Sequence, residues 1–157
     1  MTKLPAIEEM FIDAAVAQEL TAHTLLQLPQ EACGVLLGTA PAGGIRIEQF
    51  HPIRNVAPDP LHAFTFHPEQ WIPFCLKSEK LIGIVHSHPH SLPIPSQDDL
   101  THLHVYGRLL EVYLICTPNK DATSTNIQAY RIVHPSNHYN VETTQEYGLT
   151  YAQLTLT

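Results

Sequence analysis

The stretch LIGIVHSHPHSLPIPSQDDL, residues 81–100, contains the signals that decide the fold around it. Residues 81–85 are apolar on both faces, as expected of a strand in the middle of a covered sheet. Ser96 is a typical N-cap residue, and we expect a helix from Ser96 to about Tyr106, ended by Gly107. The stretch therefore predicts a buried strand, a proline-rich loop and a helix in succession.

Upstream of this stretch, the sequence predicts a helix followed by a hairpin. Residues 13–27 indicate a helix, with Asp13 placed to cap it and Pro29 just past its end. The apolar run 33–38 is of strand type, a turn follows at 41–44, and residues 45–50 alternate between apolar and polar. The two strand segments should pair as a hairpin.

The remaining segments complete a mixed α/β, or α+β, fold in one domain. Pro68 suits the first turn of a helix that runs through Trp71, and residues 134–157 form a polar, weakly patterned tail. The other expected elements are a loop at 55–60, a short strand at 63–66, strands at 109–116 and 126–133, and an edge strand at about 149–156.

The composition excludes several functional classes. With 157 residues, 44% hydrophobic residues and a net charge of −7, the chain can bury a core but has no basic surface for nucleic acid or membranes. Its three cysteines, Cys33, Cys75 and Cys116, form no CxxC pair, which favours a reducing compartment. We therefore expect a cytoplasmic protein with no nucleic-acid or membrane partner.

His86, His88 and Asp99 form a candidate metal site. The two histidines are two positions apart on a strand, so both rings project from one face near its C-terminal end. Asp99 lies in the first turn of the following helix and can point at the same place. Two imidazoles and one carboxylate, with a fourth position left for water, are what a catalytic zinc site needs.

Structural interpretations of the same residues stay open at this point. The chain has 11 histidines, so an HxH pair can arise by chance. Ser96 and Asp99 are spaced as in a capping box, and Glu31 beside a helix end is ordinarily a solvated acid. Trp71 is more simply a packing residue, His90 is expected to be exposed, and His51, His62 and His67 do not suggest a second metal site.

The whole string HSHPHSLPIPSQDDL, residues 86–100, resembles the JAMM (MPN+) metalloprotease motif, HxHP followed by a loop and SxxD. PQEACGVLLG, residues 29–38, is similar to the upstream segment in which the family places a glutamate. The resemblance covers roughly residues 11–133. It implies a single JAB/MPN-type domain over 1–157, with a mostly antiparallel curved sheet flanked by helices and a polar C-terminal extension at 134–157.

This resemblance also implies a role for each motif residue. His86, His88 and Asp99 would ligate Zn²⁺, Glu31 would be the base that acts on water, and Ser96 would donate a hydrogen bond to the oxyanion. The substrate implied is the C-terminal tail of a ubiquitin-like or sulfur-carrier protein, drawn out beside an edge of the sheet. The short loops at 55–60 and 89–95 are typical of the compact prokaryotic type.

Two other functions compete with an isopeptidase. A non-catalytic MPN-type scaffold or protein-interaction module would keep the fold and lose the ligands, whereas every motif residue is present here. A nucleic-acid-associated protein is opposed by the acidic balance. A zinc site of the cytidine-deaminase type is excluded because the required PCxxC sequence is absent. Neither the carrier protein nor the oligomeric state follows from the sequence.

Overall fold

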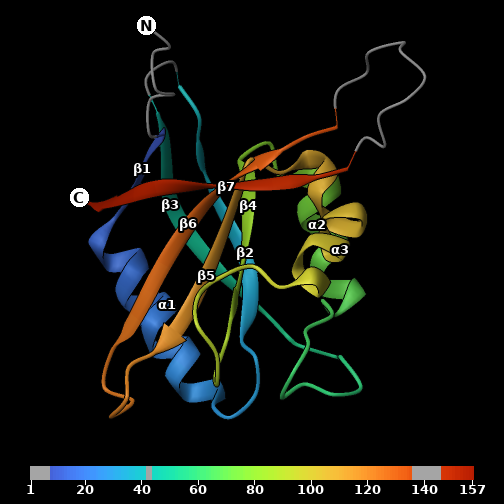
Figure 1. Cartoon of the computed structure of the whole chain (residues 1–157). Helices are drawn as coiled ribbons and strands as arrows, with labels where there is room; N and C mark the ends of the chain where they lie inside the picture. The colour runs from blue at the N-terminus through green and yellow to red at the C-terminus, as the bar shows by residue number, and fades with distance from the viewer. Residues whose placement is uncertain (1–7, 42–43, 136–145) are drawn as a thin grey trace, which may run out of the picture.

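The computed structural model describes residues 8–41, 44–135 and 146–157. These residues form a closed barrel with the strand order β1-β3-β2-β4-β5-β6-β7 (Figure 1). The strands are β1 (Glu8–Ile12), β2 (Cys33–Thr39), β3 (Ile45–Ile53), β4 (Leu81–Ser87), β5 (Val112–Pro118), β6 (Thr125–Val133) and β7 (Gly148–Leu156). The helices are α1 (Ala14–Gln27), α2 (Pro68–Lys77) and α3 (Gln97–Tyr106), followed by the short 3-10 turn η1 (Gly107–Leu109).

Neighbouring strands pair in both directions. β2–β3, β2–β4, β5–β6 and β6–β7 are antiparallel, whereas β1–β3, β1–β7 and β4–β5 are parallel. The predicted mixed α/β class and the hairpin between β2 and β3 are therefore confirmed. The expected curved sheet is instead a closed barrel, because β1 pairs with both β3 and β7 and closes the sheet on itself.

Both faces of β5 are buried, which explains its continuous apolar sequence. Val112, Leu114 and Cys116 belong to the cluster that fills the barrel, together with residues of α1. The alternate residues Tyr113 and Ile115 belong to a second cluster, under α2 and α3. In Figure 1 these two helices lie together on one side, while α1 packs against the barrel elsewhere.

Gly83 allows β4 to lie close to β5. A Cβ atom at this position would be 2.5 Å from the carbonyl oxygen of Val112, a backbone atom that cannot move aside. β4 is buried along its whole length, as its sequence predicts. The close approach fixes the strand whose end carries His86 and Ser87.

β1 was not predicted, and three of the predicted segments differ from the sequence-based expectation. Residues 63–66 form no strand, only a bridge between Asn55 and Phe66, because the Asn55 side chain bonds Ala63 and Thr65 where a neighbouring strand would. The strand expected at 109–116 begins at Val112, after the η1 turn. β7 is not an edge strand, since it pairs with both β6 and β1.

The three helices lie where the sequence predicts them, but the expected capping bond of α1 is absent. Pro68 begins α2, and Ser96 and Gly107 bound α3, as expected. Asp13 precedes α1 but makes no side-chain capping bond; its carboxylate instead pairs with Arg46 at 3.3 Å. Among the described residues, no helix is long and apolar enough to cross a membrane.

Candidate metal centre

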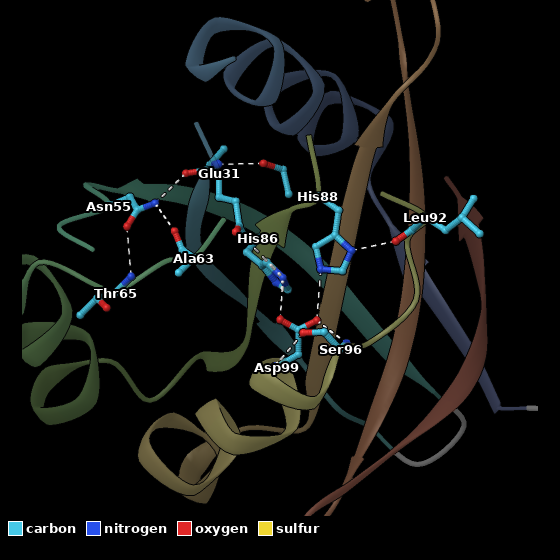
Figure 2. Close-up of polar contacts among 11 residues, drawn as sticks. Glu31, Asn55, Ala63, Thr65, His86, His88, Leu92, Ser96 and Asp99 are labelled. Atoms are coloured by element: carbon cyan, nitrogen blue, oxygen red, sulfur yellow. Dashed lines mark hydrogen bonds and ion pairs between the residues drawn. The ribbon is translucent and has the colours of Figure 1, made fainter. Parts of the chain in front are cut away.

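The end of β4 is held against the segment that precedes β2. His86 lies opposite Cys33 in the β2–β4 pairing. Ser87 binds Ala32 twice: its N–H donates to the Ala32 carbonyl at 2.9 Å, and its Oγ accepts from the Ala32 N–H at 2.7 Å. Glu31 is thereby fixed beside His86, with Oε1 3.8 Å from the ring Nε2 (Figure 2).

Asp99 reaches the same point from the first turn of α3. Its Oδ1 is 3.0 Å from His86 Nε2, and its Oδ2 is 3.1 Å from His88 Nε2. The ligand atoms of these three buried residues all lie within 4.8 Å of one another, the one such group found in the described part of the chain. His86 at the end of β4, His88 just after it and Asp99 in α3 thus converge on a single point (Figure 2).

The predicted capping box is present and orients the carboxylate. Ser96 Oγ accepts a hydrogen bond from the Asp99 N–H at 3.1 Å, and the Ser96 N–H donates to Asp99 Oδ2 at 2.8 Å. Capping and a place in the metal group are therefore compatible for Asp99. Ser96 itself is exposed and borders the cavity in front of the group.

The protonation pattern of the two rings suits a cation. His88 Nδ1 lies 2.7 Å from the Leu92 carbonyl, which can only accept, so this nitrogen carries the proton and Nε2 presents a lone pair toward Asp99. His86 Nε2 is buried and has no hydrogen bond of acceptable geometry, although Asp99 is near. Lone pairs and a carboxylate that face one another favour a positive ion between them.

Burial and charge shift the ionisation of the group. Burial alone would raise the pKa of Asp99, but the close contacts with the His86 and His88 rings outweigh it and hold that pKa below its ordinary range. Burial lowers the pKa of His86. Burial also raises the pKa of Glu31 to about 7, although the nearby His88 ring acts to lower it. Glu31 can therefore both accept and release a proton near neutral pH.

A cavity of about 350 Å³ opens in front of these residues. Phe64 forms one wall and stacks on the His86 ring, with centroids 4.7 Å apart. Glu31, His88, Ser96 and Asp99 all border it, and His86 lies 3.0 Å from Asp99, so the structure brings the five predicted residues close together. The alternative of a solvated Glu31 is wrong, since this residue is only 6% exposed.

Several residues outside the motif also shape this centre. The sequence did not predict Phe64 or Asn55, because no sequence spacing links either residue to the histidines. Asn55 Nδ2 donates to the Glu31 carbonyl at 3.1 Å. Trp71 packs on Phe66 as expected, with centroids 5.0 Å apart. His90 is exposed at the rim of the cavity. Among the described residues, His51, His62 and His67 join no metal-binding group.

The fold and this buried group together define a barrel domain with a site able to bind a metal ion. The chain belongs to the family of prokaryotic homologues of the JAB domain, whose profile matches residues 13–133. This match confirms the resemblance seen in the motif. β1 and β7 lie outside the matched range, although they close the barrel.

Relatives of this chain carry different names. A desampylase of Haloferax volcanii is 36% identical over 100 residues, which cover 61% of this chain and 68% of that protein. A probable TtuB-protein conjugate cleaving protease of Thermus thermophilus is 30% identical over 58% of this chain and 61% of its own length. The tail tip assembly protein K of Escherichia phage N15 is 29% identical over 65% of this chain, but only 39% of that protein is matched.

A solved structure supports the fold. The solution structure of a protein from Desulfitobacterium hafniense superposes with a TM-score of 0.67 and covers 94% of this chain and 92% of that one. At 20% sequence identity, this likeness speaks for the architecture and not for the activity.

Proposed function

We propose that this chain is a zinc-dependent isopeptidase of the JAMM type, which hydrolyses an amide bond at the C-terminal tail of a ubiquitin-like or sulfur-carrier protein. The observation that carries the proposal is the buried group of His86, His88 and Asp99 with Glu31 beside it. Family membership and the names of the desampylase and the conjugate-cleaving protease support the reaction class.

Zn²⁺ suits the donor set of this site. Two ring nitrogens and one carboxylate match a catalytic zinc site, and the buried Nε2 of His86 gains a partner when a metal is present. When bound, Zn²⁺ supplies Lewis-acid polarisation of a carbonyl and makes water acidic enough to ionise near neutral pH. His86, His88 and Asp99 would hold it.

Glu31 and Ser96 supply the remaining chemistry. Glu31, with a pKa of about 7, accepts a proton from the attacking water and passes it to the leaving amine. Because Ser96 Oγ already accepts a hydrogen bond from Asp99, its own O–H proton is free to donate toward the cavity. A donor at this position stabilises the oxyanion of the tetrahedral intermediate and is typically worth about 10²–10³ in rate.

We place the substrate tail differently from the expectation that it lies beside an edge of the sheet. Each strand of the described barrel has a neighbour on both sides for at least part of its length, and residues 49–53 of β3, which pair with β2 alone, do not border the cavity. The tail would instead lie along the loop that carries Leu61 and Phe64, which borders the cavity. Phe64 against His86 leaves little room there, which favours small residues such as glycine beside the scissile bond.

We also propose that the protein is cytoplasmic and has no nucleic-acid or membrane partner. Cys33, Cys75 and Cys116 are free thiols, consistent with a reducing cytoplasm. The net charge of −7 opposes nonspecific binding to nucleic acid.

The test combines metal analysis with cleavage of linear fusions. Ubiquitin-fold carriers from the same genome, each fused at the C-terminus to a reporter, are incubated with the protein and read by intact mass. We expect stoichiometric zinc and cleavage directly after the carrier. Glu31→Gln should retain zinc and lose cleavage, while the exposed matched control Glu69→Gln should retain both.

A non-catalytic scaffold is the competing function. The similarity of this chain to a phage tail tip assembly protein supports that alternative. Protein purified without chelator that contains no zinc, and is unchanged by added zinc, would favour the scaffold. Retained cleavage by Glu31→Gln would instead leave the enzyme class intact and refute the role of Glu31.

A further inference from the structure

The two histidines of the metal group differ in how their second ring nitrogen is held. His88 Nδ1 donates to the Leu92 carbonyl at 2.7 Å, which orients that ring (Figure 2). His86 Nδ1 is buried, and no group in the described part of the chain accepts from it. A metal-binding histidine almost always donates its other N–H to a carbonyl, a carboxylate or a water, because this bond fixes the tautomer and the ring.

Tyr113 lies against His86 with an unused hydroxyl. The two residues are on adjacent strands, β5 and β4, and their rings meet edge to face with centroids 5.4 Å apart. Tyr113 is 0% exposed, and its hydroxyl has no partner among the described residues. A tyrosine hydroxyl buried in a core usually finds a hydrogen-bond partner, whereas phenylalanine would fill the same space without needing one.

We propose that Tyr113 is a positioning residue for the metal ligand His86, whose Nδ1–H it holds through a buried bridging water. This inference rests on the proposed zinc site. A single water between the ring and the hydroxyl gives each of the two unpartnered atoms a hydrogen bond. The Nδ1–H tautomer is thereby fixed, and Nε2 is left with its lone pair directed at the metal position.

The surroundings keep the Tyr113 hydroxyl neutral. Burial raises the pKa of Tyr113 well above its ordinary value, and the negative charges of Asp99 and Glu31 raise it further. The hydroxyl therefore retains its proton and can both accept and donate within this network.

His102 is the other candidate partner for His86. Its Nδ1 is also buried without a partner, and its ring contacts Phe64 with centroids 4.8 Å apart. No ring contact joins His102 to His86 directly, however, because Phe64 lies against both. Tyr113 is therefore the one of the two whose ring contacts the His86 ring directly.

Zinc affinity provides the first test, measured by competition with a chromogenic chelator. Tyr113→Phe should bind zinc about 10–100-fold more weakly than the wild type, the usual cost of removing an outer-shell partner. Its metal-free melting temperature should be unchanged or higher, since a buried unpaired hydroxyl is removed. Tyr106→Phe is the matched control: its hydroxyl, in the same aromatic cluster, accepts from the Phe66 N–H at 3.3 Å, and its loss should leave zinc affinity unchanged.

A spectroscopic measurement on the wild type needs no variant. Long-range ¹⁵N correlation spectra of the zinc-loaded protein should show His86 with its proton on Nδ1, protected from solvent exchange. A freely exchanging Nδ1 proton would overturn the inference. So would Tyr113→Phe with wild-type zinc affinity, or a loss of affinity that appears in His102→Asn instead. Wild-type protein that binds no zinc would overturn the proposed function and this inference together.

Discussion

Replacing Glu31 with glutamine substitutes a neutral amide for a buried carboxyl group of nearly the same shape. Burial raises the pKa of Glu31 from 4.5 to about 7 in the folded protein. In the metal-free protein, the folded state therefore retains a proton over a pH range in which the unfolded chain has already lost it. Glutamine does not titrate, so the variant removes this pH dependence.

The size of the effect follows from the two pKa values. The difference between 7 and 4.5, at about 1.36 kcal/mol per pH unit, corresponds to about 3.4 kcal/mol. Because the carboxyl group borders a cavity that is open to solvent, screening reduces this to roughly 1–2 kcal/mol. The stabilising contribution is complete below pH 4.5 and is lost as the pH rises to about 7, since the folded state binds more protons in that window.

Urea unfolding with excess chelator, at pH 4.5 and pH 8, measures this effect. Relative to the wild type, Glu31→Gln should gain roughly 1–2 kcal/mol in free energy of unfolding between the two conditions. The same comparison with Glu69→Gln, at an exposed position on α2, subtracts the effect of removing any surface carboxylate. A stability difference that is the same at both pH values, or that shifts in favour of the wild type from pH 4.5 to pH 8, would refute the burial argument.

Three other substitutions test separate parts of the structure. Asp99→Ala should abolish stoichiometric zinc, measured by metal analysis after dialysis; undiminished zinc would show that another residue is the third ligand. Ser96→Ala should lower the free energy of unfolding by about 0.5–2 kcal/mol and slow cleavage about 10²–10³-fold. If stability falls but the rate holds, Ser96 acts only as a cap. Gly83→Ala should lower the free energy of unfolding, measured in urea, by about 1–3 kcal/mol, because the added Cβ would lie 2.5 Å from the Val112 carbonyl oxygen. An unchanged free energy of unfolding would contradict that contact.

Local signals predicted the elements around the site well. β4 is apolar on both faces, and α3 begins with Ser96 and its capping box, so both elements are determined by residues close together in the sequence. His86 and His88 share a face because side chains alternate along a strand. These features require no knowledge of distant parts of the chain.

Features that depend on distant partners were missed or misjudged. Residues 63–66 have strand-like side chains, but the Asn55 side chain occupies their backbone groups and leaves a single bridge. β7 was expected at an edge, yet it pairs with β1 from the opposite end of the sequence and closes the barrel. Pairing between the two ends of a chain leaves no local pattern in either segment.

The sequence by itself determined the donor set of the metal group, since strand alternation and the loop to α3 place His86, His88 and Asp99 together through local geometry. Only the tertiary structure decided the environment of Glu31. Its neighbour Ala32 must bind Ser87 at the end of the adjacent strand β4 before the carboxyl group becomes buried and its pKa rises. A pKa depends on everything that surrounds a group in space, and for Glu31 those surroundings come from segments dozens of residues away.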